Sequence, residues 1–91
     1  MQTENLNVVG IYTVHDKAAE RYGPLFEAVN DAVALRNFSL SMDKVPDFIL
    51  PDYQLIRVGS MDKVDGQVYI LEKFEDVASN VVVDEVVKHG K

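Results

Sequence analysis

The side chains best suited to chemistry in this sequence are a few cations and aromatic rings. Contact with nucleic acid requires cations that neutralise phosphates and flat rings on which bases stack. Tyr53 and Arg57 are four residues apart, a spacing that puts both on one face of a strand. With further tyrosine, lysine and arginine residues they form the candidate DNA-binding set: Lys17, Arg21, Arg36, Arg57, Tyr12 and Tyr53.

These residues also have a purely structural interpretation. The tyrosines are typical of half-buried sheet positions, and the cations are typical of surface pairs with neighbouring acids. Arg36, for example, is placed to pair with Asp31 or Glu27 on the flank of a helix. Judged from the residues alone, the structural interpretation is favoured, and DNA contact stays open as the alternative.

Patterns of catalysis and metal binding are not found in the sequence. Neither glycine-rich phosphate motif occurs, no serine lies in a nucleophile elbow, and cysteine is absent. The two imidazoles belong to no spaced ligand set, so we interpret His15 as a strand residue and His89 as a solvated one. We therefore expect a protein that is not an enzyme and that carries no metal or cofactor.

Composition indicates one small globular domain, with 91 residues of which 47% are apolar and 26% charged. Nine basic and fifteen acidic residues give a net charge of −6, which repels polyanions and counts against nonspecific binding of nucleic acid. The lack of cysteine suits a reducing cytoplasm. Because neither a signal peptide nor a stretch of about 18 apolar residues is seen, we expect neither export nor membrane insertion.

Hydrophobic spacing predicts an α+β fold: a small, largely antiparallel β-sheet packed against one main α-helix. The last two strands are predicted to form a hairpin, since Asp65 and Gly66 favour a turn with positive φ. The predicted strands are residues 6–15, 53–60 and 67–72.

The helix is predicted over residues 31–42, with Asn30 as its N-cap. Val33 and Leu40, seven residues apart, are predicted on the side away from the sheet, where aligned apolar residues favour an interface between subunits. The stripe predicted to pack on the sheet consists of Ala34, Leu35, Phe38 and Met42.

The connecting segments carry weaker signals. Residues 16–24 suit a loop with one helical turn over 17–21, and residues 25–29 suit either a short strand or the lead-in to the helix. The proline-containing loop after the helix is expected to pin Phe48 and Ile49 under the domain.

The predicted sheet is apolar on both faces, and one helix covers only one of them. Three covers for the second face stay open: the C-terminal tail, a second copy of the chain, or a ligand with flat apolar faces such as nucleobases. The α+β domain is expected to span residues 1–74, followed by a valine-rich segment over 75–91 that is a strand or a helix.

Five segments occur in a fixed order along the chain: IYTVHDKAA, YGPLF, NDAVALRNF, PDYQLIRVG and MDKVDGQV. Their order and spacing resemble the small non-structural protein of the gokushovirus group of single-stranded DNA phages, the Microviridae, over about residues 8–72. His15 and Met61 stand where the family pattern has aromatic residues. The resemblance implies single-stranded DNA binding in genome replication or packaging, in the host cytoplasm.

Two hypotheses of different classes follow. In the first, the protein is a module that binds single-stranded phage DNA. In the second, it is an acidic homo-oligomer, a dimer or larger, that docks on a basic replication or capsid protein of the phage through charge complementarity.

Overall fold

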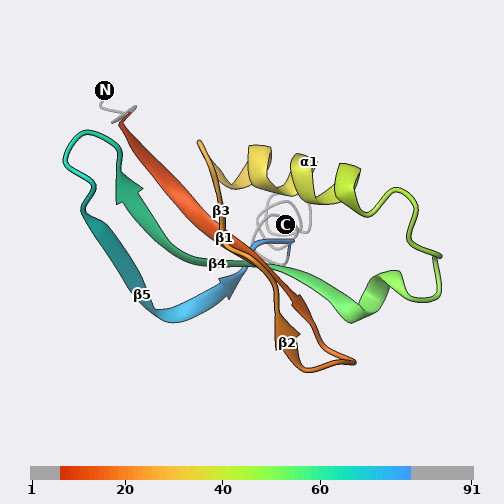
Figure 1. Cartoon of the computed structure of the whole chain (residues 1–91). Helices are drawn as coiled ribbons and strands as arrows, with labels where there is room; N and C mark the ends of the chain where they lie inside the picture. Colours follow the sequence, from red (N-terminus) through yellow and green to blue (C-terminus); the bar gives the residue numbers. More distant parts are fainter. Residues whose placement is uncertain (1–6, 79–91) are drawn as a thin grey trace, which may run out of the picture.

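A computed structural model of the protein describes residues 7–78, which form a five-stranded antiparallel sheet and one α-helix (Figure 1). The α+β prediction is confirmed. The strand order is β2-β1-β4-β5, and β3 pairs with β1 as well. The predicted valine-rich segment lies largely outside the described residues.

The central strand β1 (Val8–Asp16) consists mostly of β-branched and aromatic residues, which suit a pleated, half-buried surface. One of its edges pairs with β4 (Tyr53–Asp62) from Val8 to Asp16, with a register shift between Ile11 and Tyr12. The other edge pairs with two short strands, β2 (Arg21–Tyr22) and β3 (Phe26–Ala28). Of the two alternatives for residues 25–29, the strand is therefore the one observed.

The helical turn predicted over residues 17–21 is wrong, because the chain reverses there and returns as β2. Asp16 begins the reversal by accepting a hydrogen bond from the backbone N–H of Ala19 at 3.1 Å. Glu20 then takes a positive φ of 60°, a left-handed conformation that ends any right-handed turn. As a result, Arg21 pairs with Asp16 and Tyr22 with His15.

The helix α1 (Asp31–Ser41) begins as predicted, because the Asn30 side chain accepts a hydrogen bond from the Val33 N–H at 2.9 Å. It ends one residue earlier than predicted, at Ser41. Figure 1 shows α1 along one side of the sheet, where it contacts β3 and β1. The loop after α1 leads to a short 3₁₀ helix (Leu50–Asp52) and does not bury Phe48, whose side chain is 82% exposed.

The hairpin of β4 and β5 (Val68–Asp76) has the predicted turn, with Gly66 at a φ of 77°. Gly59 pairs with Ile70 and Arg57 with Glu75, so residues 71–74 face only Val58 and form a bulge. Figure 1 shows the sharp bend that results in the middle of β5.

Gly59 permits this close approach of β5. A Cβ atom at position 59 would meet the carbonyl oxygen of Tyr69 and would lie 3.2 Å from the Cα of Ile70. A side chain at this position therefore cannot be added without moving β5 away from β4.

The main core lies between α1 and the sheet. Its centre consists of Tyr12, Ala28, Ala34, Leu55 and Val77, all buried. Val77 in this core lies three residues beyond the predicted boundary at residue 74. Among the described residues, no helix is long and apolar enough to cross a membrane.

The second face of the sheet is apolar, as predicted. Strand alternation puts Val9, Ile56 and Val58 on this face, and all three are buried. Larger side chains stand around them and remain exposed by 47 to 65%: Tyr22, Leu25, Val68, Ile70 and Phe74.

Candidate nucleic-acid interface

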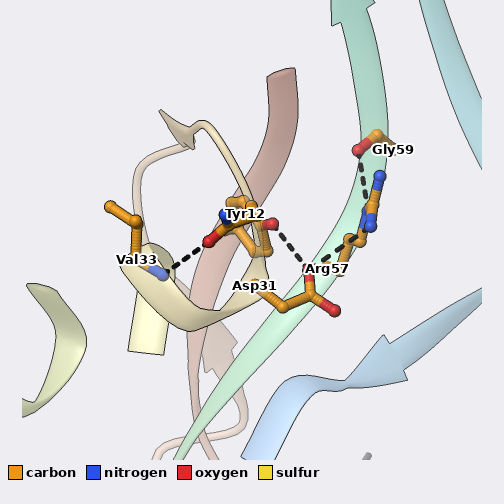
Figure 2. Close-up of polar contacts among 6 residues, drawn as sticks. Tyr12, Asp31, Val33, Arg57 and Gly59 are labelled. Atoms are coloured by element: carbon orange, nitrogen blue, oxygen red, sulfur yellow. Dashed lines mark hydrogen bonds and ion pairs between the residues drawn. The ribbon is translucent and has the colours of Figure 1, made fainter. Parts of the chain in front are cut away.

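The predicted cations do not converge on one surface. Arg57 lies under the helix start, where its Nη1 atom is 3.3 Å from the Asp31 carboxylate and its Nε donates to the Gly59 carbonyl at 3.4 Å (Figure 2). Its charge is therefore balanced within the fold. Arg36 is exposed on α1 and forms no ion pair among the described residues, and Glu27 pairs with Lys63 at 2.8 Å instead.

Tyr12 is fully buried, so the prediction that its ring offers a stacking face is wrong. Gly10, two residues earlier on the same face, leaves room for the ring, and a Cβ atom there would lie 2.6 Å from Cε1 of Tyr12. The hydroxyl donates to the Asp31 carboxylate at 2.7 Å (Figure 2). Burial and this hydrogen bond raise the pKa of Tyr12 well above its usual value of about 10.

Three of the predicted residues do meet at one end of the sheet. Lys17 and Arg21 are exposed at the reversal between β1 and β2. Asp16 pairs with Arg21 on one side and with half-buried Tyr53 on the other, so Arg21 and Tyr53 flank Asp16 on one face of the sheet. We call this region the β1–β2 end of the sheet.

The predicted interface pair on α1 is separated by the fold. Leu40 is 69% exposed, whereas Val33 is half-buried and packs against the main core. The reason is that α1 lies against β3 and β1, so the first turn of the helix buries Val33 beside Ala34. Only Leu40 remains available on the outer side of α1.

The β1–β2 end carries three aromatic rings on the second face of the sheet, His15, Tyr22 and Phe74, which we call the aromatic cluster. The His15 and Tyr22 rings stack with centroids 4.2 Å apart and an interplanar angle of 15°. Phe74 meets Tyr22 edge-on, at 6.5 Å and 79°. Because Tyr22 and Phe74 are 57% and 50% exposed, the cluster offers free aromatic surface to a flat ligand.

A chain of polar side chains orients the His15 ring. The Asp76 carboxylate accepts a hydrogen bond from Nε2 of Gln54 at 2.9 Å. The other end of this amide, Oε1 of Gln54, lies 3.0 Å from Nδ1 of His15. Since a carboxylate only accepts, Gln54 must present its oxygen to His15, and Nδ1 must carry the proton.

The rest of the second face is an aliphatic groove of about 300 Å³. Val58 and Ile70 belong to both this groove and a hollow beside the aromatic cluster, so the two regions are continuous. The charged residue at its edge, Glu27, is neutralised by Lys63. The side chains that define the aliphatic groove are Ile11, Leu25, Val58, Met61, Val68 and Ile70.

The sequence analysis missed the aromatic cluster, although part of the signal was present. His15 follows Val9, Ile11 and Thr13 in one alternating set, which places it on the second face. Tyr22 was hidden in a predicted loop, because a strand of two residues has no periodicity of its own. In the part of the chain that the structure describes, no group of three or more metal-ligating side chains occurs.

The fold and site together define a small α+β protein with exposed aromatic and aliphatic side chains on one face of its sheet. Residues 9–83 match the profile of the Phage ORF5 protein family. The chain therefore belongs to this family of phage proteins, which agrees with the expected phage origin. No curated protein and no solved structure matches the chain.

Proposed function

We propose that the protein binds single-stranded phage DNA during genome replication or packaging in the host cytoplasm, through the β1–β2 end of its sheet. The observation that carries the proposal is the exposed aromatic cluster, at the end of the sheet where Lys17 and Arg21 are also exposed. Alternation along β2 puts Arg21 on the face opposite Tyr22, so a bound strand would have to reach this cation around the edge of the sheet. Bases stack on exposed rings without sequence preference, and cations next to the rings neutralise phosphates. This site keeps Lys17, Arg21 and Tyr53 from the predicted set and replaces Tyr12 with Tyr22 and Phe74.

The net charge of −6 works against binding of a polyanion, so we expect modest affinity that is highest at low salt. Fluorescence anisotropy of a labelled single-stranded oligonucleotide measures it. Each phosphate contact contributes about −0.7 to the slope of log affinity against log salt concentration. Lys17→Gln and Arg21→Gln should each make the slope shallower by about that amount.

Variants of the cluster separate stacking from charge. Because stacking contributes about 1–3 kcal/mol per base, Tyr22→Ala and Phe74→Ala should each weaken binding about tenfold while leaving the salt slope unchanged. Phe48→Ala is the matched control for the aromatic changes, since this ring is exposed on the loop after α1. Arg36→Gln is the control for the charge changes. Absence of binding at low salt would refute the proposal.

A second candidate is an acidic protein-interaction factor, favoured by the net charge of −6. Its acidic surface would dock on a basic replication or capsid protein of the phage. Such docking weakens with salt and requires neither Tyr22 nor Phe74. A protein that fails to bind oligonucleotides but binds a purified basic phage protein, equally well after Tyr22→Ala, would support this candidate.

A further inference from the structure

We infer that the aliphatic groove is the contact surface of a homodimer, in which a second copy of this chain packs its own groove side chains against it. This inference concerns self-association and does not depend on DNA binding. The groove has a floor of buried Val58 and half-buried Ile11, between walls formed by Leu25 on one side and Val68 and Ile70 on the other.

The chemistry of the groove selects among possible occupants. A nucleic acid requires cations or rings, and a small ligand requires polar groups that fix its orientation, whereas this lining is aliphatic apart from Phe26 and the paired Glu27. A basic protein would be drawn to the acidic surfaces and not to an uncharged groove. The partner must therefore present a neutral, aliphatic surface of its own.

A second copy meets this requirement. Two chains of charge −6 repel each other over most of their surface, so they approach most easily where charge is absent. Leu25 and Ile70, each 65% exposed, project from opposite walls. In a dimer with two-fold symmetry, the projecting walls of one copy enter the groove of the other, and every contact is made twice.

The described chain ends away from the groove. It leaves β5 through Val77, which is buried in the main core on the α1 side of the sheet. This is the face opposite the groove, which favours a second copy over the C-terminal tail as the occupant.

The area predicts a weak dimer. Full burial of an aliphatic side chain removes roughly 60–120 Å² of apolar surface. The exposed walls, at 47 to 65%, therefore offer on the order of 100–200 Å², to which the partly exposed Met61 and Phe26 add. Two copies therefore bury much less than the roughly 1,200 Å² at which standard interfaces begin, so we expect weak, transient association.

Sedimentation velocity of the full chain from about 5 to 500 µM tests the inference, in the range expected for a small interface. The wild type should shift from monomer to dimer, and Ile70→Lys should stay monomeric because it buries an unpaired charge. Leu40→Lys is the matched control, an exposed aliphatic residue on α1, and should dimerise like the wild type. Both variants lower the net negative charge, so neither loses association through added repulsion.

Three results would overturn the inference: a wild type that stays monomeric, an Ile70→Lys variant that still dimerises, or a Leu40→Lys variant that loses the dimer. Circular dichroism verifies that both variants are folded. Methyl NMR gives an independent readout, in which the Val68 and Ile70 signals should move with protein concentration while those of Leu40 stay fixed.

Discussion

The Tyr12→Phe variant, which lacks the buried hydroxyl, should be less stable than the wild type at neutral pH. This difference in stability should disappear at alkaline pH. A hydrogen bond to a charged group contributes about 1.5–3 kcal/mol. The low end applies here, because the Asp31 carboxylate is 30% exposed and keeps Arg57 as a partner in the variant. We therefore expect the free energy of unfolding to fall by about 1.5 kcal/mol at pH 7.

The pH dependence follows from the raised pKa of Tyr12. In the unfolded chain, the hydroxyl ionises above pH about 10, while the folded protein keeps the proton. The unfolded wild type is therefore stabilised as the pH rises past 10, by about 1.4 kcal/mol at pH 11. The phenylalanine variant has no proton to lose at this position, so the difference between the two proteins should shrink to nearly zero at pH 11.

Urea unfolding followed by circular dichroism at pH 7, 9, 10 and 11 measures this difference. Tyr69→Phe is the matched control, because it removes a hydroxyl from a side chain that is 54% exposed, and it should follow the wild type at every pH. A difference between wild type and Tyr12→Phe that keeps the same size from pH 7 to 11 would refute the reasoning. In that case the hydroxyl would ionise as easily in the folded protein as in the unfolded chain.

Three further changes test the fold. Gly59→Ala should separate β5 from β4 at the Tyr69 carbonyl and lower the free energy of unfolding in urea by more than 2 kcal/mol. Amide exchange should become faster in the hairpin alone, and unchanged exchange in β5 would contradict the packing. Asn30→Ala should lower the free energy of unfolding by about 1 kcal/mol, because the N-cap is lost, whereas Asn30→Asp should change it little. Equal losses of stability in the two variants would show that the cap contributes nothing. Leu55→Ala should leave a cavity in the core and lower the free energy of unfolding by about 2–5 kcal/mol, and a loss below 1 kcal/mol would mean that the core collapses to fill it.

The features predicted correctly from sequence are those that local physics determines. β1, the β4–β5 hairpin and the Asn30 cap each depend on residues adjacent in the chain: β-branched runs, a glycine with positive φ, and a side chain that reaches an N–H three residues on. The two apolar faces of the sheet were also predictable, since they follow from strict alternation along β1.

The errors concern contacts between distant segments. Whether Tyr12 is exposed depends on where α1 brings Asp31, and whether Arg57 is free depends on the same placement. Strand β2 exists only because β1 offers an edge to it, and Phe74 joins the aromatic cluster only through the bulge in β5. Spacing along the chain does not tell which distant segments come into contact. Gly10, two residues before Tyr12, was nevertheless an indication that the Tyr12 ring is buried.

The bulge over residues 71–74 also has a consequence for how the protein survives at high concentration. β5 is the outermost strand of its sheet, and a straight outermost strand with exposed valine, isoleucine and phenylalanine would be a template for runaway polymerisation into fibrils. The bend prevents a strand of a neighbouring molecule from pairing with β5 along its full length. The bend thereby lowers the tendency of the concentrated protein to form insoluble aggregates.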